Sequence, residues 1–118
     1  MIMLDDRLQT ALNIWLATAR PDGRPHLVPI WFVMAEGRCY ICTGSQSIKA
    51  RNLRANPRVA VALEDGTNAF VVEGTARPVP ASPDVIDKFK AKYNWDITAD
   101  PPYDTVFEIE FEKQVMGK

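Results

Sequence analysis

Short segments of strand-favouring residues, separated by tight turns, recur along most of this 118-residue chain. The last one, residues 106–111, alternates cleanly, with Phe107, Ile109 and Phe111 on one side and Glu108 and Glu110 on the other. That pattern is typical of a strand with one buried face and one face in water. The other five segments cover residues 14–19, 25–34, 38–43, 58–64 and 69–79. Most connections are short enough for antiparallel pairing and closure would hide the two sheet edges, so the sequence predicts a mostly β, six-stranded antiparallel barrel.

Three further segments have apolar residues at helical spacing, and they cover residues 4–13, 48–56 and 84–93. Asp5 and Asp6 suit the start of the first helix, because the helix dipole favours negative charge there. A serine cap precedes the second helix, which is expected to stop before Pro57. A length of 118 residues suits one domain with a modest core, so we expect a single domain over residues 1–118.

Charge and composition exclude several classes of function. The formal net charge is -1 and no basic block dominates, so the electrostatic footprint of a nucleic-acid-binding protein is missing. The apolar stretches are too short to span a bilayer. Residues 1–6 have neither the basic nor the apolar region of a signal peptide. We therefore expect a cytoplasmic protein that binds neither nucleic acid nor membranes.

Two cysteines, Cys39 and Cys42, have the spacing of a redox or metal motif. They fall within a predicted strand, where residues three apart point to opposite faces. A zinc site would also need further ligands, and the chain offers one histidine and no other cysteine. The sequence therefore predicts two structural cysteines and no metal site.

The second predicted strand, residues 25–34, is apolar on both faces. Its faces carry His26, Val28, Ile30, Phe32 and Met34 on one side, and Leu27, Pro29, Trp31 and Val33 on the other. A barrel interior covers one face, so the other needs a helix, a second subunit or a flat aromatic ligand. Pro29 cannot donate to a sheet ladder, which places it at a bulge or on an edge strand.

Residues 43–53 combine three hydroxyl side chains with the start of the second predicted helix. The free N–H groups and the dipole at a helix N-terminus favour an anion. Lys49 lies in the first turn and Asn52 shares its face, while Arg51 could make a bidentate contact with a phosphate. The alternative is a capped surface helix with solvated basic residues. The spacing alone leaves both interpretations open.

The chain resembles the pyridoxamine 5'-phosphate oxidase-like superfamily, the flavin-binding split barrels, which includes members that use the deazaflavin coenzyme F-420. The most specific part is Lys-x-Arg-Asn-Leu from Lys49, followed by Asn-Pro-Arg-Val from Asn56. Similar stretches lie at residues 16–26, 28–32, 47–53 and 106–117. The resemblance implies a six-stranded split barrel that forms a homodimer, with FMN or the deazaflavin bound at the subunit interface.

The resemblance also implies roles for individual residues. Lys49 and Ser47 would hold the cofactor phosphate, supported by Arg51 or Asn52. The strand residues Val28, Pro29, Ile30 and Trp31 would lie against the ring system, and Thr43 would contact the ribityl chain or ring edge. Many relatives that use the deazaflavin have a basic residue where this chain has Ser47.

Three functions follow as hypotheses. The first is an FMN-dependent oxidoreductase acting on a small organic substrate. The second keeps the fold but replaces FMN with coenzyme F-420. The third is a protein that stores or carries a flavin or haem without catalysis, because no general-base arrangement stands out and the role of the single histidine, His26, is open.

Overall fold

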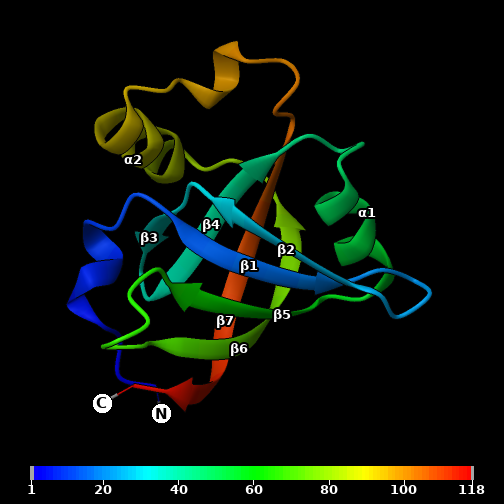
Figure 1. Cartoon of the computed structure of the whole chain (residues 1–118). Coiled ribbons are helices and arrows are strands. Elements are labelled where there is room, and N and C mark those ends of the chain that lie inside the picture. Colours follow the sequence, from blue (N-terminus) through cyan, green and yellow to red (C-terminus); the bar gives the residue numbers. More distant parts are fainter. Residues whose placement is uncertain (1, 118) are drawn as a thin grey trace.

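Seven antiparallel strands form one curved sheet in the computed structural model, which describes residues 2–117 (Figure 1). The strands are β1 (Ile14–Ala19), β2 (Pro25–Ile30), β3 (Val33–Ala35), β4 (Arg38–Thr43), β5 (Arg58–Leu63), β6 (Val71–Val79) and β7 (Thr105–Met116). Their order in the sheet is β2-β1-β5-β6-β7-β4-β3. Strands β2 and β3 are therefore the two edges, and the barrel is open between them. Pro29 lies on edge strand β2, as its missing N–H predicts.

The expected count of six strands is wrong, because the segment over residues 25–34 divides into β2 and β3. The division falls at Trp31 and Phe32. There the Tyr93 hydroxyl accepts from the Phe32 N–H at 3.0 Å and donates to the Phe32 carbonyl at 3.0 Å. The Phe32 backbone therefore bonds to a helix side chain instead of a neighbouring strand, and the chain bends. The expected bounds of β1 and β4 are confirmed, while β7 continues to Met116.

Two of the three expected helices form. Helices α1 (Ile48–Ala55) and α2 (Pro83–Tyr93) start at serine caps, Ser47 and Ser82, whose side chains accept backbone N–H groups of the first turn. The expected helix over residues 4–13 is only a short 3-10 helix, η1 (Asp6–Gln9). A second 3-10 helix, η2 (Ile97–Ala99), follows α2. The expected apolar stripe is not buried as a unit, because Leu8 is buried but Leu12 is exposed. Neither α-helix within residues 2–117 is long and apolar enough to cross a membrane.

Two apolar cores hold these elements together. The larger lies inside the curved sheet and includes Ile14, Leu16 and Ile109. The smaller lies between α2 and the outer face of the sheet and consists of Val33, Val85, Phe89, Ile97 and Val106. It fixes α2 and the chain after it over β3 and β4, above the sheet in Figure 1. The cysteines lie as predicted, with Cys39 in the larger core and Cys42 on the opposite face of β4.

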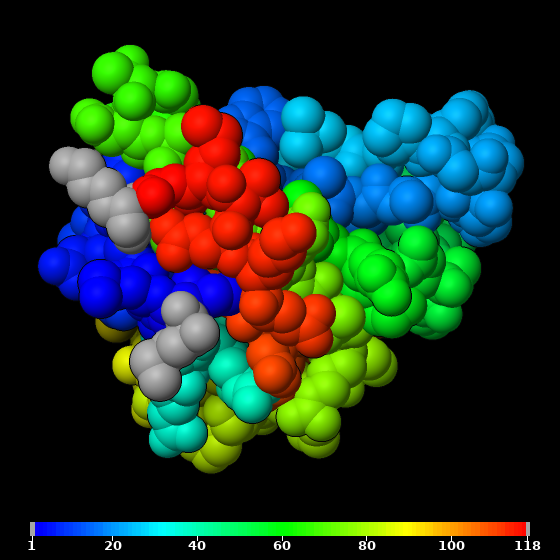
Figure 2. Space-filling model, turned by 90° about the horizontal axis from the view of Figure 1, so that it is seen from below, coloured from blue at the N-terminus to red at the C-terminus, as the bar shows by residue number. Residues whose placement is uncertain are grey.

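The outer face of β1 and β2 is apolar and uncovered in this chain. Trp15 pairs with Pro29 and Ala17 with Leu27 across the two strands. Leu27 is 60% exposed, so no helix covers this face. Of the three covers that the sequence left open, a helix is therefore excluded at Leu27. The turn of the β1–β2 hairpin projects from the body of the molecule (Figures 1 and 2). Figure 2 also shows the C-terminal part of β7, in red, lying across the surface beside the blue N-terminal segment.

Candidate functional site

A cavity of about 450 Å³ opens where β2 and β4 end and α1 begins. It is lined by Pro29, Ile30, Trp31, Ile41, Cys42, Lys49, Trp95, Asp100 and Tyr103. A volume between 300 and 1,000 Å³ is typical of small-molecule sites. The lining joins one charged group of each sign to a mostly apolar and aromatic surface, so the cavity suits a flat organic ligand with an anionic group.

Lys49 is the cation of this cavity. It lies in the first turn of α1 and is half-buried, and its ammonium group has no hydrogen bond or ion pair with any of residues 2–117. Burial lowers the pKa of its ammonium group. A partly desolvated charge without a partner is costly, and a bound anion would offset that cost. The backbone N–H groups and dipole at the start of α1 add to the attraction for an anion.

The turn before α1 is tied to the chain that follows α2. Asp104 accepts from the Ser45 backbone N–H at 2.8 Å and from the Ser45 hydroxyl at 3.0 Å. Arg54 donates to the Ser45 carbonyl at 2.8 Å. A Cβ atom at Gly44 would lie 2.7 Å from the Pro102 carbonyl oxygen, so glycine is required for this close approach. These contacts hold Tyr103 and Lys49 on the same cavity.

Aromatic rings form the other side of the cavity. Trp31 stacks on Tyr93 of α2, with ring centroids 4.4 Å apart and planes 5° apart. Trp95 meets Trp31 and Tyr103 edge-on, at 5.7 Å and 5.1 Å. The Trp95 indole N–H donates to the Asp100 carboxylate at 2.9 Å. The cavity is therefore lined by rings whose positions are fixed by other rings and by hydrogen bonds.

Of the nine cofactor-binding residues predicted from the sequence, four line this cavity. They are Pro29, Ile30 and Trp31 at the end of β2, and Lys49. Val28 is half-buried on the inner face of β2, where it packs against the larger core. Residues 29–31 and Lys49, far apart in the chain, are thus brought together at one cavity, and their contacts with a cofactor stay a prediction.

The other four predicted residues lie nearby but do not line the cavity. The Thr43 and Ser47 hydroxyls bond to each other at 3.1 Å, and Ser47 also caps α1. Asn52 is buried and its amide donates to the Thr18 hydroxyl at 2.9 Å. Arg51 is exposed on α1. In this structure Thr43, Ser47 and Asn52 have structural partners, and any contact of these residues with a cofactor stays a prediction.

His26 lies close to this anion-favouring region. Its ring atom Nδ1 is buried without a hydrogen-bond partner in the described chain. The pKa of His26 is lowered by burial and by the positive charges of Arg20 and Lys49. The neutral imidazole is therefore favoured as long as no anion balances these two cations.

Sequence reasoning missed five lining residues: Ile41 and Cys42 of β4, and Trp95, Asp100 and Tyr103. Cys42 had been interpreted as structural, and burial together with Asp100 and Asp104 raises the pKa of its thiol to about 11. Trp95, Asp100 and Tyr103 come from the chain between α2 and β7, where Pro101-Pro102 indicated a loop. A tryptophan and a tyrosine in a proline-containing loop are a weak signal, because nothing local places that loop over β4.

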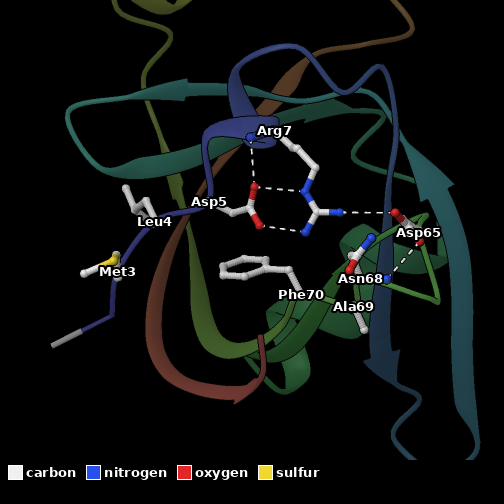
Figure 3. A pocket seen from close by; sticks show the side chains of 8 residues that line it. All are labelled: Met3, Leu4, Asp5, Arg7, Asp65, Asn68, Ala69 and Phe70. Atoms are coloured by element: carbon white, nitrogen blue, oxygen red, sulfur yellow. Dashed lines mark hydrogen bonds and ion pairs between the residues drawn. The ribbon is translucent and has the colours of Figure 1, made fainter. Parts of the chain in front are cut away.

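A second cavity, of about 520 Å³, lies beside η1 and is shown in Figure 3. Its cation, Arg7, is already paired: the guanidinium bonds to Asp5 at 2.7 Å and to Asp65 at 3.5 Å. Phe70 lies next to this ion pair. The second cavity is larger, but its charges are satisfied within the chain, so the cavity at Lys49 is the better candidate for a ligand site.

An open antiparallel barrel with a ligand-sized cavity beside an unpaired ammonium is an arrangement of the split-barrel class. The model of the pyridoxamine 5'-phosphate oxidase family matches residues 4–114, and the chain belongs to this family. The search of curated proteins gave no match.

Solved structures support the same fold. An F-420 reductase superposes with a TM-score of 0.77 and 24% identity, covering 96% of this chain and 98% of that chain. HutZ, the haem storage protein of Vibrio cholerae, gives a TM-score of 0.73 at 21% identity, with 93% and 91% covered. HupZ of Group A Streptococcus gives 0.69 at 15% identity, with 95% and 92% covered. At such identities the likeness concerns the fold.

Proposed function

We propose that this protein binds FMN in the cavity at Lys49 and acts as an FMN-dependent oxidoreductase on a small organic substrate. The observation that carries the proposal is the half-buried Lys49 ammonium, which has no partner within the described chain and lies at the N-terminus of α1. Membership of the pyridoxamine 5'-phosphate oxidase family supports it.

The residues of the cavity suit such a cofactor. Lys49 and the free N–H groups at the start of α1 would hold the phosphate. Pro29, Ile30 and Trp31 would lie against the ring system and keep water from one of its faces. Once bound, the flavin itself supplies hydride or single-electron transfer. The chain's contribution is then binding, orientation and exclusion of solvent.

The direct test is a titration with FMN, followed by quenching of flavin fluorescence, on the wild type and on Lys49→Gln. Loss of a charge-assisted contact to phosphate weakens binding by about 10- to 100-fold. Lys90→Gln is the matched control, because Lys90 is an exposed lysine of α2 away from the cavity. No binding at micromolar FMN, or equal affinity of Lys49→Gln and wild type, would refute the proposal.

Two other ligands have specific support. Coenzyme F-420 is favoured by the likeness to an F-420 reductase, while Ser47, in place of a basic residue, favours FMN. A competition titration between FMN and the deazaflavin decides between them.

Haem storage is supported by the likeness to HutZ. Two results together would favour it: a haem absorption band that forms on addition of haemin, and no turnover of a hydride donor by the FMN-loaded protein.

A homodimer is part of the same proposal. The outer face of β1 and β2 exposes Trp15 and Leu27 with small residues between them, and exposed apolar patches of this kind often mark interfaces. Leu27→Glu should convert a dimer into a monomer in light scattering. Leu12→Glu is the matched control, since Leu12 is 59% exposed but lies outside this face. A wild-type mass of one chain at micromolar concentration would contradict the dimer.

A further inference from the structure

The segment between α2 and β7 contributes a complete wall to the cavity. Trp95, Asp100 and Tyr103 all line the cavity and all come from this one stretch. The stretch is held from both ends: Ile97 is buried in the smaller core, and Asp104 bonds to Ser45. The wall is therefore a built surface whose side chains have fixed positions.

The chemistry of this wall differs from that of the Lys49 side. The Asp100 carboxylate receives one hydrogen bond, from the Trp95 indole, and has no ion pair with any of residues 2–117. Tyr103 is 45% exposed and Trp31 is 48% exposed, so ring surface remains open beside the carboxylate. The faces of aromatic rings carry negative electrostatic potential and attract cations. Asp100 and the three rings thus favour the same kind of ligand group.

We infer that the wall of Trp95, Asp100 and Tyr103 recognises the second reactant of this site, a flat aromatic molecule that carries a positive charge. The inference rests on the proposed function, which assigns Lys49 to the cofactor phosphate. With Lys49 neutralised in that way, Asp100 is the charge of the cavity that remains unpaired. A carboxylate framed by aromatic rings selects a planar cation over a neutral or anionic molecule of the same size.

The test uses two probes of matched shape, 1-methylquinolinium (a cation) and quinoline (neutral at pH 7.5), with the full chain. The chain has three tryptophans, and their indole N–H signals in a ¹H–¹⁵N spectrum report binding. Trp31 and Trp95 line the cavity, whereas Trp15 lies on the outer face of β1 and serves as an internal control. The quantity of interest is the ratio of the two affinities, cation over neutral probe.

Asp100→Asn removes the charge and leaves an oxygen to accept from Trp95. The affinity ratio should fall about tenfold, since the charge–charge attraction that this substitution removes contributes roughly that factor in a partly buried site. Lys49→Gln should raise the ratio, because it removes a like charge from the same cavity. Asp87→Asn is the control for charge removal, as Asp87 is exposed on α2 outside the cavity, and it should leave the ratio unchanged.

An unchanged ratio in Asp100→Asn would overturn the inference. So would shifts confined to the Trp15 signal. Because the probes are tested without FMN, the two hypotheses fail separately. If FMN does not bind but Asp100→Asn lowers the affinity ratio, the proposed cofactor is wrong and the inference about the wall is supported. If FMN binds through Lys49 but Asp100→Asn leaves the affinity ratio unchanged, only the inference about the wall is wrong.

Discussion

Lys49 lines the same cavity as Trp31, and Tyr93 stacks on Trp31, but the two side chains differ in how their polar groups are satisfied. The Lys49 ammonium has no partner within the described chain, which leaves it available to an anion. The Tyr93 hydroxyl accepts from the Phe32 N–H at 3.0 Å, and its single proton has two acceptors, the Phe32 carbonyl at 3.0 Å and the Leu12 carbonyl at 2.9 Å. Since the Tyr93 ring also stacks on Trp31, one side chain sets both the bend after β2 and the orientation of a cavity ring.

Tyr93→Phe should destabilise the protein by about 1–3 kcal/mol, because the Phe32 N–H and the Leu12 carbonyl lose their partner, while Lys92 still donates to the Phe32 carbonyl and the ring stacking is kept. Urea denaturation measures the change in the free energy of unfolding. Tyr103→Phe is the control, since no hydrogen bond of the Tyr103 hydroxyl occurs among residues 2–117, and its stability should match the wild type. Equal stability of both variants would show that the Tyr93 hydroxyl does not hold the bend.

The pKa of His26 should respond to an anion at Lys49. Burial, Arg20 and Lys49 lower this pKa from its ordinary value of 6.5, and a bound phosphate group offsets the two positive charges. Addition of FMN should therefore raise the pKa of His26. The chain has one histidine, so an NMR titration reads it without ambiguity. A pKa that does not move when FMN is bound would place the phosphate away from Lys49.

Among the elements, the turn that leads into α1 decides where the anion-binding helix end lies. This turn touches the loop before β7 through Ser45 and Asp104, and through the close approach of Gly44 to Pro102. The two segments are far apart in the chain but together frame the cavity. The start of α1 is therefore positioned by long-range contacts as well as by its own serine cap.

Gly44→Ala should lower stability by about 1–3 kcal/mol, since the added Cβ atom would meet the Pro102 carbonyl oxygen at 2.7 Å and the loop must shift. The affinity for FMN should fall as well, because the shift displaces Tyr103 relative to Lys49. Gly66→Ala is the matched control, as nothing lies within 4 Å of a Cβ atom there. Thermal unfolding and the FMN titration measure the two effects. A fully stable Gly44→Ala variant would argue against the close approach.

On the scale of the whole molecule, a charged cluster joins β4, β6 and β7 on the outer face of the sheet. Glu108 is buried and accepts from the Tyr40 hydroxyl at 2.8 Å and from Arg77 at 3.0 Å. Arg38 bridges Glu108 and Glu110, at 3.4 and 2.6 Å. Burial by itself would raise the pKa of Glu108, but the Tyr40 and Arg77 hydrogen bonds outweigh it and the pKa is lowered.

This cluster predicts sensitivity to acid. A carboxylate with a lowered pKa in the folded state stabilises the fold above its unfolded value, 4.5, and the contribution is lost as the pH falls through the lower folded value. The wild type should therefore lose more stability than Glu108→Gln between pH 5 and pH 3, a window set by that value of about 4.5. Urea denaturation across this range measures the difference. Glu73→Gln, at an exposed position of β6, should follow the wild type, and a parallel curve for Glu108→Gln would contradict the argument.

The local parts of this protein were determined by the sequence itself. Alternation and turn residues placed β1 and β4 at their observed bounds, and the serine before Ile48 placed the start of α1, together with Lys49. The resemblance carried by Lys-x-Arg-Asn-Leu indicated the family that the comparison then showed. These features depend on neighbours within a few residues, so they can be read from the chain.

Tertiary structure decided what depends on distant partners. The bend between β2 and β3 comes from Tyr93, which lies 61 residues beyond Phe32. The buried Asn52 amide donates to the Thr18 hydroxyl. The wall of Trp95, Asp100 and Tyr103 reaches the cavity because Ile97 and Phe89 pack on the outer face of the sheet. No local pattern encodes these contacts, since each forms when two segments that are far apart in sequence meet on the folded sheet.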